Sequence, residues 1–68
     1  MKYNFGGGLR RTLDEKGITM SSLAEKTGIS YNMIKKYCSG EADPTIGYAK
    51  RIAEAAETSI DELMGYRP

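Results

Sequence analysis

The sequence predicts an all-α fold, a compact bundle of five short helices. Apolar residues recur at helical spacing in each expected segment, and no alternating strand pattern, repeat or low-complexity stretch interrupts them. A residue whose side chain commonly caps a helix precedes every segment: Asn4, Thr19, Ser30, Thr45 and Ser59. Glycines that favour helix ends follow four of the five: Gly17, Gly28, Gly40 and Gly65. With 68 residues, the chain is expected to form one domain, residues 1–68, with a small core.

The first helix is expected over about residues 5–16. Phe5, Leu9 and Leu13 form its apolar stripe at four-residue spacing. The glycines at 6–8 are expected to weaken its start, because each costs up to about 1 kcal/mol relative to alanine in a helix interior. They do not indicate a phosphate-binding loop, since no strand precedes them and the Lys-Ser/Thr ending of such a loop is absent.

Residues 19–40 are expected to form two short helices joined by a glycine turn. The first begins after Thr19 and ends at Gly28, where a positive φ allows a tight exit. The second begins after Ser30 and ends at Gly40. It is expected to bury Ile34, Met33 and Tyr37, and to expose Tyr31, Asn32, Lys35 and Lys36.

The last two helices follow a loop around Asp43-Pro44. The fourth is expected from Ile46 to about Glu57, and its core stripe is predicted to comprise Ile46, Ala49, Ile52, Ala53 and Ala56. A short fifth helix is expected from Ile60 to Met64, since Ser59 and Glu62 have the spacing of a capping box.

Composition excludes several classes of protein. The chain has no histidine and one cysteine, so we expect no metal site, no cofactor, no internal disulfide and no enzymatic activity. It also lacks an apolar run long enough for a membrane span and the apolar core of a signal peptide, so a cytoplasmic location is expected. Residues 1–40 carry seven basic and three acidic side chains, a net +4, whereas residues 41–68 carry three and six, a net −3. This asymmetry hints at a surface facing a polyanion, but on charge alone ordinary surface charge is the favoured explanation.

From Phe5 to Met64 the chain resembles the lambda-repressor-like, Cro-type (XRE) helix-turn-helix family. The matching pieces, in family order, are FGGGLRRTLDEKGIT, SSLAEKTGIS, MIKKYCSG and DPTIGYAKRIAEAAETSIDELM. The resemblance implies a sequence-specific DNA-binding transcriptional regulator, a small Cro-like repressor whose 30–39 helix lies in the major groove of double-stranded DNA.

The resemblance also implies roles for individual residues. Four side chains at the start of the 30–39 helix would contact bases: Ser30, Tyr31, Asn32 and Lys36. Others would contact the DNA backbone: Thr19, Met20, Ser21, Ser22 and Lys35. The alternative for all of them is an ordinary solvated helix surface.

Three departures from the family pattern stand out. Met20 replaces a glutamine that braces a phosphate in many relatives, and Glu41 and Asp43 occupy a loop that is often basic. Leu13 and Cys38 occupy the positions of a common arginine–glutamate pair. Because both charges are replaced together, we expect the two side chains to be buried near each other. Cys38 is expected to be a core residue rather than a redox switch.

Two functional hypotheses remain open. A repressor of this type is expected to bind DNA as a homodimer, with its two reading helices one DNA turn apart, about 34 Å. Its interface candidates are Ile60, Leu63, Met64 and Tyr66. The alternative is a protein-interaction module, a co-regulator or antitoxin-like partner, that uses the same fold without contacting DNA bases. Neither hypothesis includes a small-molecule substrate or a membrane.

Overall fold

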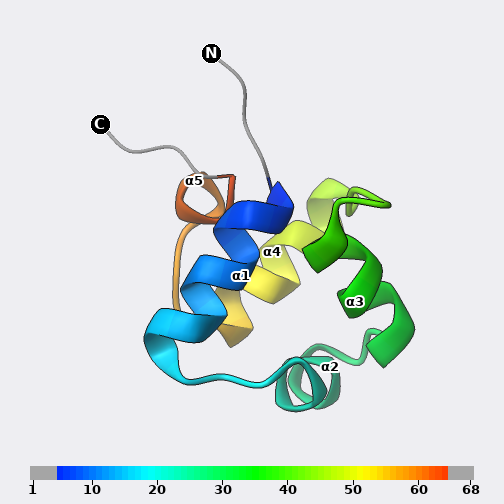
Figure 1. Ribbon diagram of the computed structural model, residues 1–68, viewed down its shortest axis with the longest axis horizontal. Helices are drawn as coiled ribbons and strands as arrows, with labels where there is room; N and C mark the ends of the chain where they lie inside the picture. Colours follow the sequence, from blue (N-terminus) through cyan, green and yellow to red (C-terminus); the bar gives the residue numbers. More distant parts are fainter. Residues whose placement is uncertain (1–4, 65–68) are drawn as a thin grey trace.

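A computed structural model describes residues 5–64, which form five α-helices without strands (Figure 1). The predicted all-α fold class and the number of helices are thereby confirmed for this part of the chain. Predictions that concern Asn4, Gly65 and Tyr66 fall outside the described residues. The helices are α1 (Phe5–Lys16), α2 (Met20–Thr27), α3 (Tyr31–Ser39), α4 (Ile46–Ala55) and α5 (Ile60–Leu63).

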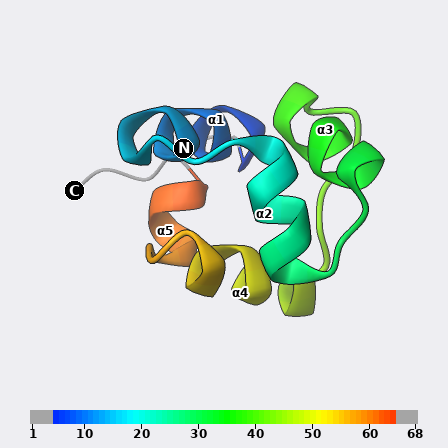
Figure 2. The ribbon, with the colours of Figure 1, turned by 90° about the horizontal axis from the view of Figure 1, so that it is seen from below.

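The five helices surround one core, with α1 and α4 on opposite sides of it (Figure 2). Helix α1 packs against α3 and α5, and α2 packs against α3 and α4. Each helix contributes one fully buried side chain to the centre: Leu9, Leu23, Ile34, Ile52 and Leu63. Burying a side chain of this size contributes about 1.5–3 kcal/mol, so this cluster is the main source of stability in a chain of this length.

Four predicted caps are confirmed. The hydroxyl oxygens of Thr19, Ser30, Thr45 and Ser59 each accept a hydrogen bond from the backbone N–H three residues later, at 3.0–3.2 Å. Helix ends are equally well defined, since Gly28 and Gly40 take φ values of 74° and 84°. The boundaries of α2 and α3 are therefore set by local contacts that their own sequences encode.

The glycines of α1 have a packing role that the sequence did not reveal. A Cβ on Gly6 would lie 2.7 Å from the Tyr37 carbonyl oxygen, and one on Gly8 would lie 2.0 Å from that of Leu63. The helix nevertheless begins at Phe5. These glycines therefore allow the backbone of α1 to approach α3 and α5 closely, which offsets their unfavourable helix propensity.

Three sequence predictions need correction. Helix α4 ends at Ala55 rather than near Glu57, because Glu57 takes a φ of 53° and its carbonyl accepts a hydrogen bond from Lys16 Nζ at 2.9 Å. Ile46 is 77% exposed rather than part of the core stripe, since burial along α4 starts only at Ala49. Leu63 is fully buried, so it belongs to the core and not to an interface.

Candidate nucleic-acid interface

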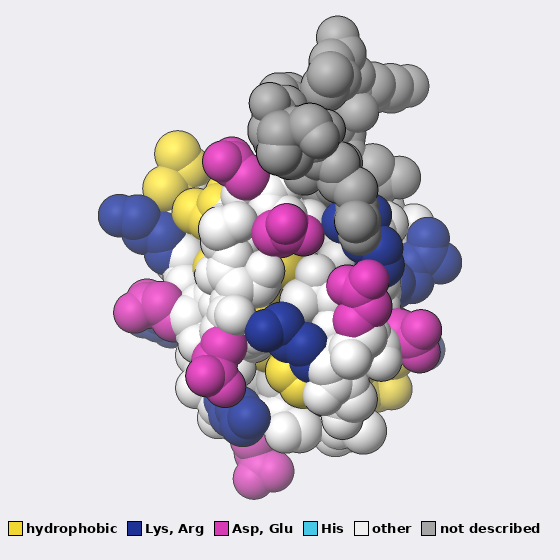
Figure 3. Space-filling view, turned by 90° about the vertical axis from the view of Figure 1, so that its left-hand side faces the viewer, with side chains coloured by type: hydrophobic (Ala, Val, Ile, Leu, Met, Phe, Trp, Pro, Cys, Tyr) yellow, Lys and Arg dark blue, Asp and Glu magenta, His cyan; other side chains and the backbone are white. Residues whose placement is uncertain are grey.

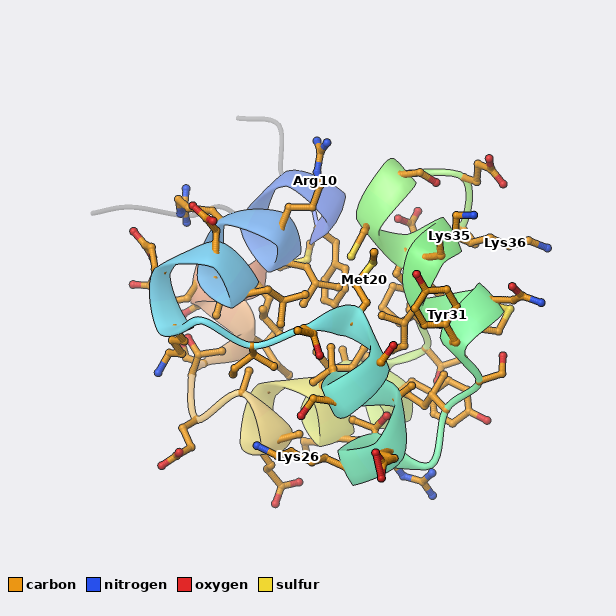
Figure 4. All side chains as sticks on the ribbon, turned by 60° about the horizontal axis from the view of Figure 1, so that its bottom comes forward. Arg10, Met20, Lys26, Tyr31, Lys35 and Lys36 are labelled. Atoms are coloured by element: carbon orange, nitrogen blue, oxygen red, sulfur yellow. The ribbon has the colours of Figure 1, made fainter. Side chains whose placement is uncertain are left out.

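The outer surface of α3 is polar and open to solvent. Tyr31, Asn32, Lys35 and Lys36 are all exposed, as predicted, and Tyr31 retains 44% of its accessible surface. They occupy the first and second turns of the helix, and Figure 4 shows Tyr31, Lys35 and Lys36 along it. The surface is therefore free for a partner; whether these side chains contact bases stays a prediction.

The opposite side of α3 is fixed in the core. Ile34, Tyr37 and Cys38 are buried, and the Tyr37 ring meets the Phe5 ring edge-on at a centroid distance of 6.4 Å. Because α3 also has a serine cap and a glycine end, its polar face is presented on a rigid helix. A preorganised face of this kind limits the entropy lost on binding.

The turn between α2 and α3 depends on Thr27, a residue that the sequence analysis did not single out. Its hydroxyl donates to the Leu23 carbonyl at 2.8 Å and accepts from the Ile29 N–H at 3.2 Å. Gly28 and the buried Ile29 complete the turn. A threonine late in a helix, directly before a glycine, is a weak sequence signal, because the same residue is common on helix surfaces.

The start of α2 faces solvent only in part. Thr19 and Ser21 are exposed and Ser22 is half-buried. The Met20 side chain packs against the core, so its backbone, rather than its side chain, remains available for a phosphate. The amides of Met20 and Ser21 precede the first intrahelical bond, which Leu23 N–H donates to the Thr19 carbonyl at 3.0 Å. First-turn amides of this kind are donors for anions.

A groove of about 550 Å³ lies between α1, α2 and α3. Its apolar lining consists of Leu13, Ile18, Met20 and Cys38, and its polar lining of Arg10, Asp14, Thr19, Lys35 and Ser39. Leu13 and Cys38, which occupy the positions of the family's arginine–glutamate pair, were predicted to be buried near each other. This prediction is confirmed, since they are 6% and 5% exposed and line the same groove.

Cys38 behaves as a core residue with one charged neighbour. Burial raises the pKa of its thiol above the ordinary value, and the positive charge of Arg10 partly opposes that rise. The thiol is therefore neutral at physiological pH, which favours a packing role over a redox role.

Charge is distributed unevenly around α3. Arg10 and Lys35 line the groove on one side, whereas the exposed carboxylates of Glu41 and Asp43 follow its C-terminal end. The side of the molecule that carries α5, by contrast, mixes acidic and basic side chains with small apolar patches (Figure 3). Among the described residues visible there, no continuous cationic surface forms.

Neither a membrane helix nor a metal cluster appears in residues 5–64. No helix there is long and apolar enough to cross a membrane. In the same part of the chain, no group of three His, Cys, Asp or Glu side chains is placed to hold a metal ion.

Comparison with known proteins gives consistent matches. A helix-turn-helix family model matches residues 9–63. The cryptic phage CTXphi transcriptional repressor RstR of Vibrio cholerae is 49% identical over 47 residues, which cover 69% of this chain and 42% of the repressor. The chain thus spans less than half the length of that relative.

Two solved structures share the fold with a TM-score of 0.83 each. One is a transcriptional regulator from Listeria innocua, 32% identical, with 100% of this chain and 64% of that protein covered. The other is the restriction-modification controller protein C.AhdI from Aeromonas hydrophila, 23% identical, with 90% and 92% covered. At that lower identity the likeness shows the fold alone.

Proposed function

Because the chain belongs to the helix-turn-helix family whose model it matches over residues 9–63, we propose that it is a DNA-binding transcriptional regulator. It would act as a small repressor that places α3 in the major groove, where a helix fits and base edges are distinguishable. The observation that carries the proposal is the polar face of α3, exposed along its length and braced from behind by buried Ile34, Tyr37 and Cys38. The repressor RstR and the Listeria regulator support it by similarity.

Each exposed side chain on α3 has a chemistry suited to DNA. The Asn32 amide would make a bidentate contact to adenine, and the Lys36 ammonium would donate to guanine. Tyr31 would contact a thymine methyl group or donate to a phosphate, and Ser30 would touch a phosphate while it caps α3. Around them, Lys35 and the start of α2, with Thr19, Met20, Ser21 and Ser22, would bind the DNA backbone.

A homodimer is part of the proposal. Two copies would place their α3 helices about 34 Å apart on a near-palindromic site. Of the interface residues predicted from the sequence, Ile60 and Met64 are half-buried and remain candidates within the described part of the chain. The proposal also includes a cytoplasmic location, where a regulator of this kind meets its DNA.

Selection from random DNA, followed by titration of the purified chain on the selected fragment, tests the proposal. We expect binding that weakens steeply with salt and a consensus with two related half-sites. Asn32→Ala and Lys36→Ala should each lose about 1–3 kcal/mol of discrimination at one base position while the far-ultraviolet circular dichroism stays unchanged. Lys50→Ala, on the exposed side of α4, is the matched control. Binding without any sequence preference would refute the repressor proposal.

A protein-interaction module is the second candidate. It is favoured by Ile46 and Tyr48, which are 77% and 39% exposed at the start of α4, directly after Glu41 and Asp43 in the chain. Exposed apolar side chains that follow carboxylates in the chain suit a protein partner better than a phosphate backbone. If this candidate is right, Asn32→Ala and Lys36→Ala will leave regulation in cells intact, while Ile46→Ser will abolish it.

A further inference from the structure

We infer that the groove between α1, α2 and α3 holds a phosphate of the DNA backbone, with Arg10 and Lys35 as its two cationic ligands. This inference rests on the DNA binding proposed above and deepens it. It adds Arg10, a residue of the first helix, to the interface. It also places the main backbone anchor on the groove side of α3 instead of in the loop at residues 41–45.

The positions of the two cations carry the first step. Arg10 projects from α1 and Lys35 from α3, and Met20 lies between the two helices (Figure 4). Both cations are exposed and line the same groove. Neither makes a hydrogen bond or ion pair with another residue in the range 5–64. Two charges from separate helices therefore flank one groove without an ion-pair partner among the residues that the structure describes.

Arg10 differs in this respect from its neighbour Arg11. The Arg11 guanidinium donates to the Glu62 carbonyl oxygen at 3.3 Å and lies 3.9 Å from the Glu62 carboxylate, so it ties α1 to α5. The positive charge of Arg10 instead acts on the pKa of the Cys38 thiol, which lines the groove. Arg11 therefore has a structural role, and Arg10 is left for a ligand.

The chemistry of the groove favours an anion with an apolar neighbour. A guanidinium binds phosphate with two parallel hydrogen bonds, and a lysine adds a point charge. The first turn of the eight-residue helix α2 lies on the same groove through Thr19 and Met20 and adds backbone donors. Leu13 and Met20 supply an apolar wall, against which a deoxyribose can pack.

Acidic side chains at two places determine where the DNA backbone can lie. Asp14 also lines the groove, so its net charge is +1, which still attracts phosphate but less than the two cations alone would. Glu41 and Asp43, past the end of α3, repel it. A DNA strand that follows α3 thus gains on the groove side and loses on the loop side.

The test measures DNA affinity against salt for four variants of the full chain, on the fragment selected by the unchanged protein. One phosphate contact contributes about 0.9 to the steepness of log K against log salt, and the two cations share one phosphate, so Arg10→Gln and Lys35→Gln should each lower the steepness by a part of that amount. Each should also weaken binding about tenfold at low salt, as expected for one charged hydrogen bond. Asp14→Asn should act in the opposite direction and tighten binding.

Lys26→Gln is the matched control, because it removes one positive charge at the far end of α2 (Figure 4). It should leave the slope unchanged. Arg10→Gln should keep the preferred DNA sequence, since a phosphate contact carries no base information. Ethylation of single phosphates should identify one phosphate whose modification weakens binding of the unchanged protein more than binding of Arg10→Gln.

The possible failures are distinct. Three results would overturn the inference while DNA binding itself stands. The first is a salt slope that Arg10→Gln leaves unchanged, and the second is an equal loss of slope in Lys26→Gln. The third is a changed sequence preference in Arg10→Gln. If the unchanged protein shows no salt-dependent binding to DNA, the proposed function is wrong, and the inference that rests on it is wrong as well.

Discussion

Gly8 sets how closely α1 approaches α5. A Cβ at this position would meet the Leu63 backbone, with its carbonyl oxygen at 2.0 Å, and a backbone group cannot move aside as a flexible side chain can. Gly8→Ala should therefore destabilise the fold by about 1–3 kcal/mol or more, although alanine is the better helix former. Chemical denaturation followed by circular dichroism measures the change.

Gly47 is the matched control for Gly8. It lies in the first turn of α4, where a Cβ would meet only the Thr45 hydroxyl oxygen, at 3.9 Å. Gly47→Ala should stabilise the fold by about 0.5–1 kcal/mol through propensity alone. Equal effects of the two substitutions would contradict the close packing of α1 on α5.

Cys38 and Tyr37 make stability sensitive to alkali. Burial raises the pKa of Cys38 above 9.0, and burial, followed by the charge of Tyr48, raises the pKa of Tyr37 above 10.0. Both groups are neutral when protonated, so the unfolded chain releases its protons first as the pH rises. The stabilisation is complete below about pH 9 and is lost as the pH climbs through the folded-state values.

Denaturation between pH 7 and pH 11 tests this reasoning. The free energy of unfolding should stay level to about pH 9 and then fall. In Cys38→Ala the fall should begin about one pH unit higher, where tyrosine starts to ionise in the unfolded chain. An unchanged onset in that variant would show that the thiol is not the group that titrates first.

At the scale of the element, Ser30 links the stability of α3 to its contact with DNA. Its hydroxyl accepts from the Met33 N–H at 3.2 Å, so Ser30→Ala should cost about 1 kcal/mol of stability. Aspartate caps helices as well as serine does, so Ser30→Asp should keep the stability. Its carboxylate should nevertheless repel the phosphate proposed to lie there and weaken DNA binding about tenfold or more.

The control for Ser30→Asp is Ser59→Asp, the same change at the cap of α5. Ser59 accepts from the Glu62 N–H at 3.2 Å and caps α5, which packs mainly against α1 and α4 and does not line the groove. The Ser59→Asp substitution should therefore change neither the stability of the fold nor its affinity for DNA appreciably. If both aspartate variants bind DNA like the unchanged protein, α3 does not approach a phosphate with its first residue.

The sequence predicted the elements whose signals are local. Thr19, Ser30, Thr45 and Ser59 cap because the partner amide lies three residues away, so distance along the chain already implies contact. The same local signals, together with helical periodicity, predicted the all-α fold class, which is confirmed. The exposure of Ile46 could not be foreseen, because helical periodicity does not say where the neighbouring helices stop covering α4.

Tertiary neighbours explain the other misses as well. Gly6 and Gly8 appeared unfavourable from the sequence because their contribution is close packing against the backbones of α3 and α5. Those segments are far away in sequence. Glu57 takes a positive φ where Lys16 reaches its carbonyl. Arg10 was one basic residue among ten until the fold placed it across a groove from Lys35. The outward face of α3, in contrast, followed from helical geometry alone.

At the scale of the whole molecule, the charges form a gradient across α3. Cations line the groove at its α1 side, carboxylates follow its C-terminal end, and the side that carries α5 is mixed (Figure 3). Such a distribution affects the orientation of a bound polyanion more than its affinity. Glu41 and Asp43 repel a DNA backbone that approaches the C-terminal end of α3, so they disfavour the reversed docking orientation. Moderate affinity with a strongly fixed orientation is the expected result.

Reversing the charges of Glu41 and Asp43 should therefore change the affinity for DNA more than the loss of any single surface charge. The double variant Glu41→Lys with Asp43→Lys should bind DNA more tightly, and its salt slope should steepen by up to about 1.8 if each lysine reaches a phosphate. Titration on one fragment at several salt concentrations measures both quantities. The matched control is Glu54→Lys with Glu57→Lys, which adds the same charge at the far end of α4, where any gain would reflect net charge only. Equal slopes in the two double variants would place the 41–45 loop beyond reach of the DNA and would show that the gradient does not orient it.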